Sequence, residues 1–182
     1  MHAGMIYFIH MHHVTPKEVS YPPHILNARK NLQLIMNDRQ KQILIGSILG
    51  DAYIYRQGKI QFEHSDKQKD YLFWKFGELE SLAYGRPRIV ERIDKRTCQT
   101  YRSYRFWLRQ YFRQWRQIFY KEKRKIFPEG LHLTPLSIAI WYMDDGCFSD
   151  NNCILSTDSF PDDSLQRIQS ALYSNFHLHT LI

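Results

Sequence analysis

Two apolar stretches with the same kind of ending constrain the fold of this chain more than any other feature. Residues 39–54 read RQKQILIGSILGDAYI and residues 131–148 read LHLTPLSIAIWYMDDGCF. Each is an apolar run with helical spacing that ends where an acidic residue stands beside a glycine. The two acids at these ends, Asp51 and Asp145, are 94 positions apart. This repetition predicts two similar helices that end in similar turns.

Both runs carry boundary signals. In the second run, Thr134 can cap a helix, Pro135 suits its first turn and Gly146 marks its stop. These signals predict a helix over about residues 135–144. In the first run, Gly50 loosens the end of the helix directly before the acid.

The glycine spacing predicts how the two helices meet. Gly46 and Gly50 lie four residues apart and therefore on one face, where a second helix can approach more closely than the usual ~8–10 Å between helix axes. If the two helices pack side by side, Asp51 and Asp145 meet at their C-terminal ends. The helix dipole is negative there and the acids repel each other, so bound divalent cations would relieve both penalties. Hard oxygen ligands favour Mg²⁺ or a similar ion.

At these residues the chain resembles the LAGLIDADG homing endonucleases and their intron-maturase relatives. LIGSILGDA (residues 44–52) is similar to the first motif of that family, and IAIWYMDDG (residues 138–146) to the second. Aligned on their eighth position, the motifs place the family's metal-binding acids at Asp51 and Asp145. The alternative is a pair of buried packing helices whose terminal acids are incidental.

The resemblance also implies the rest of a metal-dependent catalytic site. Gly50 and Asp144 stand beside the two acids and are included among the candidate metal ligands, Asp144 as a supporting acid or a turn cap. The implied ion is Mg²⁺ or Mn²⁺. In the family, a lysine three residues before a proline is thought to polarise the attacking water, and Lys125 before Pro128 matches it. A solvated or phosphate-binding lysine is the alternative interpretation of Lys125.

The fold that the resemblance implies is α+β, with two pseudo-symmetric repeats of the order αββαββα. The motif helices would pack at the repeat interface, and the antiparallel strands would form a saddle over DNA. We expect an N-terminal extension over residues 1–37, a first repeat over 38–133 and a second repeat over 134–182. The counterpart of Lys125 would fall beyond residue 182, so the second repeat is expected to be incomplete.

Periodicity and turn residues predict the elements between and after the motifs. They are a hairpin over residues 53–64, a helix over 66–83, a strand pair over about 88–93 and 100–107, a helix over 108–119, a hairpin over 148–157, a helix opened by Pro161 and a strand over 176–182.

Charge favours a polyanionic partner. The chain has a net charge of +7 and a pI near 9.3. Residues 86–125 hold 14 Lys or Arg against three acids, a local charge of +11, interleaved with aromatic residues. This pattern suits a folded nucleic-acid surface. The three cysteines lack CxxC spacing, so neither a zinc site nor a disulfide framework is indicated, and no apolar run is long enough to cross a membrane.

The two predicted hairpins of the first repeat supply the candidate DNA contacts. A two-stranded ribbon fits the major groove, where Gln can read adenine and Arg or Lys can read guanine or bind phosphate. An ordinary solvent-exposed face would look much the same. The candidates are Tyr53, Tyr55, Arg56, Lys59, Gln61, Arg88, Arg92, Lys95, Arg96 and Arg102.

Together with the charge pattern, the resemblance implies a site-specific endonuclease that hydrolyses double-stranded DNA at a long recognition site, with one set of catalytic groups per strand. We expect a monomer, made in a mitochondrion or chloroplast and independent of membranes. Three alternatives stay open: an RNA maturase that binds its own intron, a DNA-binding protein without catalysis, and a truncated inactive remnant.

Overall fold

The computed structural model describes residues 35–149 and 151–181, which belong to one compact unit. Almost all of the expected N-terminal extension, residues 1–34, lies outside the described residues. In chain order the elements are α2 (Asp38–Leu49), β1 (Tyr53–Ile54), β2 (Ile60–Ser65), the 3₁₀ helix η1 (Asp66–Gln68), α3 (Lys69–Leu79), η2 (Glu80–Leu82), β3 (Arg88–Ile93), β4 (Thr100–Trp107), α4 (Arg113–Phe119), β5 (Tyr120–Lys121), β6 (Arg124–Lys125), α5 (Pro135–Asp145), β7 (Gly146–Ser149), β8 (Asn152–Leu155) and α6 (Asp162–Phe176). None of the described helices is long and apolar enough to cross a membrane.

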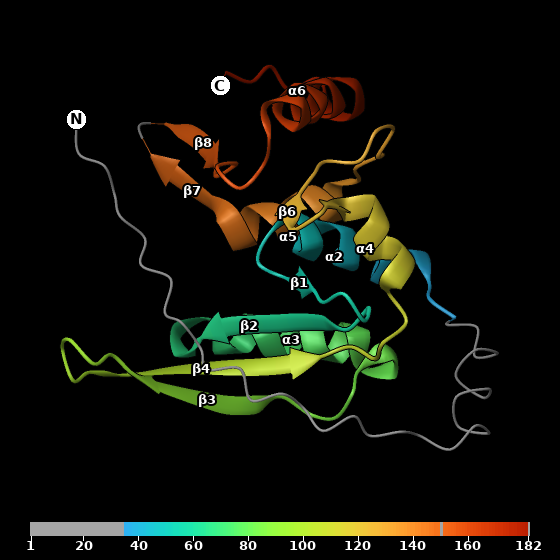
Figure 1. Cartoon of the computed structure of the whole chain (residues 1–182). Coiled ribbons are helices and arrows are strands. Elements are labelled where there is room, and N and C mark those ends of the chain that lie inside the picture. The colour runs from blue at the N-terminus through green and yellow to red at the C-terminus, as the bar shows by residue number, and fades with distance from the viewer. Residues whose placement is uncertain (1–34, 150, 182) are drawn as a thin grey trace. The chain divides into compact units, whose positions relative to one another are not determined.

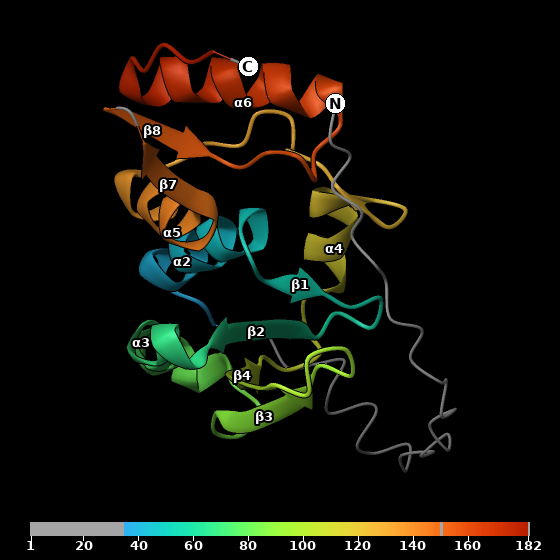
Figure 2. The same ribbon diagram turned by 90° about the vertical axis from the view of Figure 1, so that its left-hand side faces the viewer.

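The two motif helices, α2 and α5, lie side by side (Figures 1 and 2). Each begins with a capping box, formed at α5 by Thr134 and Ser137, so the predicted start of this helix is confirmed. A Cβ added at Gly46 would lie well inside 3.0 Å of the Ser137 carbonyl oxygen and 2.7 Å from Ile140 Cβ. One added at Gly50 would lie 2.5 Å from Asp144 Cβ. The close approach that the glycine spacing predicts is therefore confirmed.

A four-stranded antiparallel sheet in the order β1-β2-β4-β3 follows α2 (Figure 1). Helix α3 covers one face of it, because apolar side chains alternate along β2 and meet an apolar stripe of the helix. Phe62 of β2 stands opposite Phe106 of β4, and their rings stack with centroids 4.6 Å apart. Phe76 of α3 packs edge-on against Phe106 at 5.5 Å. The opposite face of this sheet, away from α3, is called the outer face below.

The chain beyond α5 forms the β7–β8 hairpin and helix α6, as predicted. Trp141 of α5 is fully buried and contacts the rings of Phe127 and Phe160, with centroid separations of 6.3 and 5.9 Å. Helix α6 contributes Ile168 and Leu172 to the same core. Its buried residues recur at helical spacing, and the helix is joined to the segment before α5 by hydrogen bonds of Ser164 and Arg167 to the Phe127 backbone.

Two predicted elements need correction, and one element was not predicted. The strand over residues 176–182 is wrong: α6 continues to Phe176, His177 ends it in the left-handed region (φ 55°), and residues 177–181 form no strand. Helix α4 begins at Arg113, later than predicted, because Leu108 is held in a β-bridge to Ala83. The small β5–β6 hairpin was not predicted from the sequence.

Candidate active site

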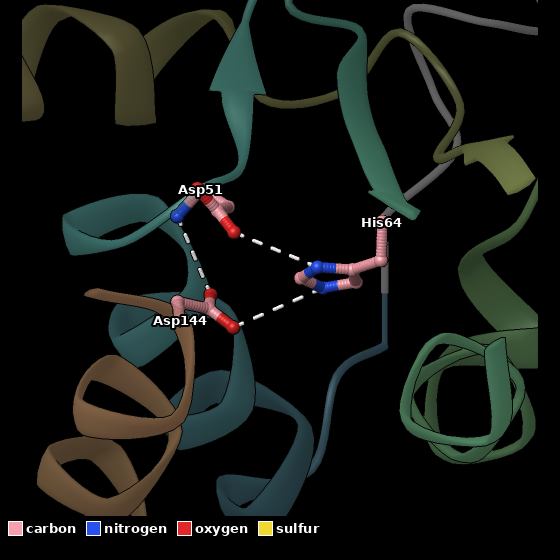
Figure 3. Close-up of side chains that lie close together, drawn as sticks. All are labelled: Asp51, His64 and Asp144. Carbon is pink, nitrogen blue, oxygen red and sulfur yellow. Dashed lines mark hydrogen bonds and ion pairs between the residues drawn. The ribbon is translucent and has the colours of Figure 1, made fainter. Parts of the chain in front are cut away.

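Asp51 lies directly after α2. Gly50 closes that helix by donating its N–H to the Gly46 carbonyl oxygen at 3.0 Å, and the chain then turns towards β1. The Asp51 side chain is 43% exposed. Its backbone N–H donates to Oδ2 of Asp144 at 3.4 Å, so the turn after α2 is fastened to the end of α5 (Figure 3).

Three carboxylates gather at this point. Partial burial, followed by the charges of Asp144 and Asp145, raises the pKa of Asp51 to about 6. Burial and the charge of Asp144 also raise the pKa of Asp145, against the opposing effect of Lys125. The two acids that the sequence predicts to meet therefore lie within electrostatic range of each other. Their mutual repulsion is the condition that a bound cation relieves.

Lys125 reaches this group of acids from the β5–β6 hairpin. Glu122, in the left-handed region (φ 56°), turns the hairpin, and Tyr120 stands opposite Lys125. The Lys125 ammonium donates to the Gly50 carbonyl oxygen. Burial lowers the pKa of Lys125, whereas the charges of Asp145 and Asp51 act in the opposite direction. This lysine is thus a partly buried neighbour of the acids and not a solvated side chain of a basic run.

Sequence reasoning missed a second buried lysine. Lys75, in the middle of α3, is fully buried, and its Nζ lies 2.6 and 2.9 Å from the two carboxylate oxygens of Asp144. The Asp144 side chain is also fully buried. Removing one member of a buried charge pair strongly destabilises the fold, because the other charge then stays buried without a partner. Asp144, one of the candidate metal ligands, is therefore committed to an internal ion pair.

His64 completes this cluster and was also missed. It lies on the α3-facing side of β2 and is 3% exposed. Its Nε2 is 3.2 Å from Lys75 Nζ and 3.8 Å from Asp144 Oδ1, and its Nδ1 is 3.5 Å from Asp51 Oδ2 (Figure 3). Burial, followed by the charge of Lys75, lowers the pKa of His64 to about 4, although Asp144 acts to raise it.

Both missed residues carry a signal in the sequence. Lys75 stands three residues after Leu72 and four before Leu79, which are both fully buried, so it occupies the apolar stripe of its helix. His64 alternates with Phe62 on the core face of its strand. A polar residue at such a position needs a buried partner, which the sequence alone does not name.

The donor set suits a hard divalent cation. Asp51 and Asp145 offer carboxylate oxygens, the ligands that Mg²⁺ and Mn²⁺ prefer. Ligand atoms of Asp51, His64 and Asp144 also lie within 4.8 Å of one another. However, the Lys75 ammonium contacts both Asp144 oxygens and His64 Nε2, so the space between them already holds a positive charge. The pair Asp51 and Asp145 fits a cation better than that trio.

The strand pairing places four of the candidate DNA contacts on the outer face of the sheet. Tyr53 stands opposite Gln61, Arg88 opposite Arg105, and Arg92 opposite Tyr101. Arg105, which the sequence analysis did not single out, belongs to the same face. The remaining candidates are placed elsewhere: Tyr55, Arg56 and Lys59 in the β1–β2 connection, Lys95 and Arg96 in the β3–β4 turn, and Arg102 on the α3-facing side, where its Nη2 is 2.8 Å from Glu91 Oε1.

Glu63 organises the charges of the outer face. Its carboxylate accepts hydrogen bonds from Arg92 Nη1 at 2.5 Å, Arg105 Nε at 2.7 Å and Ser103 Oγ at 2.7 Å. Partial burial acts to raise the pKa of Glu63, but the hydrogen bonds from these three residues lower it to about 2. Two arginines are thereby held in fixed orientations on a surface rich in positive charge.

Fold and site together define an α+β protein in which two packed helices bring acids to one point beside an antiparallel sheet. The chain belongs to the LAGLIDADG DNA endonuclease family, whose model matches residues 41–182. The family that the two motifs indicated is thus confirmed.

Individual relatives agree with this assignment. The chain is 28% identical over 157 residues to cytochrome b mRNA maturase bI2 of Saccharomyces cerevisiae, a match that covers 77% of this chain and 37% of that protein. It is 31% identical over 125 residues to the protein RecA of Mycolicibacterium chitae, covering 63% of this chain and 27% of that protein. The chain therefore spans about a third of the first relative and about a quarter of the second.

A solved structure shares the fold. It is that of the homing endonuclease I-WcaI bound to its DNA recognition sequence, with a TM-score of 0.73 and 23% sequence identity. The match covers 88% of this chain and 78% of that one. At this level of identity the likeness shows the fold, and the predicted α+β architecture with an antiparallel sheet is confirmed.

Proposed function

We propose that this chain is a site-specific, metal-dependent endonuclease that hydrolyses phosphodiester bonds of double-stranded DNA at a long recognition site. The observation that carries the proposal is the meeting of acids from the ends of two closely packed helices beside a partly buried lysine. The charges of Asp144 and Asp145 raise the pKa of Asp51, and Lys125 lies close enough to Asp51 and Asp145 for their charges to act on it. Two like charges held together at a half-exposed surface, beside a partly buried lysine, support a functional site.

In this proposal Asp51 and Asp145 hold Mg²⁺ or Mn²⁺. The bound cation would supply activation of water and stabilisation of the leaving oxygen. Lys125 is held by the Gly50 carbonyl oxygen, which fixes its ammonium beside the acids. From there Lys125 can donate a hydrogen bond to the phosphodiester and stabilise negative charge that develops in the transition state. Gly50 acts in this scheme as the anchor of Lys125, and Asp144 as the buried partner of Lys75.

The outer face of the sheet would read the DNA. Gln61 and the two arginines fixed by Glu63 present planar hydrogen-bonding groups of the kind that recognise adenine and guanine edges in the major groove. The exposed cations of the β3–β4 turn, Lys95 and Arg96, suit phosphate contacts. Arg102, on the opposite face, is left out of the proposed interface.

Two pseudo-repeats, over residues 38–133 and 134–182, are part of the proposal. The order helix, two strands, helix occurs in α2–β1–β2–α3 and again in α5–β7–β8–α6. This recurrence supports a duplicated unit in which each motif helix serves one DNA strand. A monomeric state and synthesis in a mitochondrion or chloroplast stay predictions from the sequence.

An RNA maturase is the second candidate function. It is favoured by the similarity to a protein named cytochrome b mRNA maturase bI2. Binding to a folded intron would use the same basic surface but would not require the acids. Splicing that survives in Asp51→Asn protein would favour the maturase over the nuclease.

Cleavage by acid-substituted variants tests the nuclease. DNA duplexes that bind the unmodified protein in the presence of Ca²⁺ are selected from a random library. They are then incubated with Mg²⁺ and either the unmodified protein or a variant. Asp51→Asn and Asp145→Asn should each abolish cleavage and leave binding largely intact, whereas Asp158→Asn, at an exposed loop acid outside the site, should cleave normally. Normal cleavage by either of the first two variants removes that residue from the mechanism.

A further inference from the structure

We infer that Lys75 and His64 form a positioning relay behind the candidate metal site: Lys75 fixes which ring nitrogen of His64 carries the proton, and His64 thereby directs an N–H at the carboxylate of Asp51. This inference rests on the proposed function, because it assigns the two residues a role in orienting a proposed metal ligand. They would act through Asp51, without touching substrate.

The first step follows from donor chemistry. A lysine ammonium has donors and no acceptor, and Lys75 Nζ lies 3.2 Å from His64 Nε2. Nε2 must therefore accept this hydrogen bond. A ring nitrogen that accepts a hydrogen bond carries no proton, so the ring proton of His64 resides on Nδ1.

The second step concerns where the Nδ1–H points. Nδ1 is buried and has no hydrogen-bond partner of normal length in the described part of the chain, although the Gln68 side chain also lies near the ring. Asp51 Oδ2 lies 3.5 Å away, and a small rotation of this half-exposed side chain brings it into hydrogen-bonding range (Figure 3). A buried N–H is unfavourable without an acceptor, so the ring and the carboxylate satisfy each other.

The third step is that Asp51 is connected to Lys75 twice. Through its side chain, Asp51 faces His64, which accepts from Lys75. Through its backbone N–H, Asp51 bonds Asp144, which is paired with Lys75. The two routes form a closed circuit of hydrogen bonds that restrains both the main chain and the carboxylate of Asp51. Partners of this kind orient metal ligands, and their loss weakens metal affinity.

The same contacts argue against His64 as a metal ligand. Its Nε2 is engaged by Lys75, and its Nδ1 carries the proton that the relay requires. A metal can bind only a ring nitrogen that has lost its proton. His64 therefore supports the site without binding the ion.

Two amide substitutions separate the roles of the ring nitrogens. The amide nitrogen of Asn overlies Nδ1 of a histidine, whereas that of Gln overlies Nε2. His64→Asn keeps a donor near Asp51, and His64→Gln keeps a polar group near Lys75 only. Mn²⁺ binding, measured by the electron paramagnetic resonance of the free ion, should weaken about 10- to 100-fold in His64→Gln. It should stay within about threefold of the unmodified protein in His64→Asn.

Nitrogen-15 NMR of the imidazole tests the proton position independently of metal and of catalysis. The His64 ring, assigned by its absence from the His64→Asn spectrum, should show a protonated Nδ1 and an unprotonated Nε2 at pH 7. In a Lys75→Met/Asp144→Asn double variant, which removes both buried charges together, the two tautomers should mix. A single Nε2–H tautomer in the unmodified protein overturns the relay, as does equal Mn²⁺ affinity in the two His64 variants.

The two proposals fail in different ways. If the unmodified protein binds no Mn²⁺ but its ring carries the proton on Nδ1, the proposed nuclease site is refuted and the hydrogen-bond arrangement around His64 stands. If Mn²⁺ binds normally and the proton lies on Nε2, the nuclease site stands and the relay is refuted.

Discussion

The contact between the two motif helices offers a quantitative test in Gly46→Ala. The new Cβ would meet the Ser137 carbonyl oxygen and the Ile140 Cβ, both within 3.0 Å, and both belong to α5. Since one of these atoms is backbone, the helices must separate. Overpacking of a core costs about 1–3 kcal/mol, and replacing a glycine inside a helix returns about 1 kcal/mol. A contact with backbone belongs to the upper part of the overpacking range, about 2–3 kcal/mol. After the gain from replacing glycine, we expect the free energy of unfolding to decrease by about 1–2 kcal/mol.

Gly77→Ala is the matched control, because Gly77 is also inside a helix but an added Cβ meets nothing within 4 Å. It should stabilise the protein by about 0.5–1 kcal/mol. Urea unfolding followed by circular dichroism measures both variants, and the Gly46→Ala midpoint should fall while the Gly77→Ala midpoint rises. Equal stabilisation by both would falsify the close helix contact. Separation of the helices should also move Asp51 from Asp145, so Mn²⁺ affinity should fall in Gly46→Ala alone.

The remaining predictions concern charge. Mn²⁺ affinity, measured by calorimetry, should decrease as the pH falls below about 6, because the pKa of Asp51 is raised to about 6 and the ion must displace its proton. Without metal, the free energy of unfolding should decrease as the pH rises from 3.8 to about 6, since Asp51 ionises less readily in the folded state than in the unfolded state. A flat affinity from pH 5 to 8 would contradict this. Lys125→Met should slow cleavage about 10²–10³-fold with little change in binding, whereas Lys123→Met, in the exposed hairpin turn, should cleave at the normal rate. Glu63→Gln should free two arginines for phosphates, so that affinity for unrelated DNA rises and its salt dependence steepens by about 0.9 per new contact; an unchanged salt dependence would show that the arginines do not move.

The motif helices could be predicted from the sequence because their signals are local. Thr134 and Pro135, which are adjacent in the sequence, determine where α5 begins. The glycines of α2 lack side chains on one face, so another helix can pack closely there. The meeting of Asp51 with the end of α5 then follows from geometry, once the two helices are paired. Caps, glycines and apolar spacing are the features that a single sequence records well.

The relay behind Asp51 could not be predicted because it depends on three elements brought together only in the folded chain. Lys75, 11 positions after His64, meets Asp144 from a helix 69 positions further on. The sequence shows a lysine in an apolar stripe, but the charge that it pairs with comes from α5. A long-range partner of this kind leaves no local mark other than a polar residue where an apolar one is expected.

The error after α6 has a similar cause. Residues 176–182, FHLHTLI, alternate as a strand does, but a strand also needs a neighbour for its backbone. In the structure the Leu178 N–H donates to the Leu172 carbonyl oxygen, and Gln169 Nε2 donates to the Thr180 carbonyl oxygen, so residues 177–181 fold back on their own helix (Figure 2). The pattern describes which side chains share a face and says nothing about what stands beside the backbone.

The balance of charges at the site explains why two lysines are buried there. Lys75 pairs with Asp144 at full burial, which offsets part of the repulsion that this carboxylate exerts on the other two acids. Lys125 offsets one of the two negative charges of Asp51 and Asp145. When both acids are ionised, this leaves an excess of about one negative charge. A divalent cation would reverse that excess to one positive charge, which a single phosphodiester then neutralises. The site is therefore unfavourable for phosphate alone and favourable for phosphate with metal, so metal and DNA should each strengthen the binding of the other.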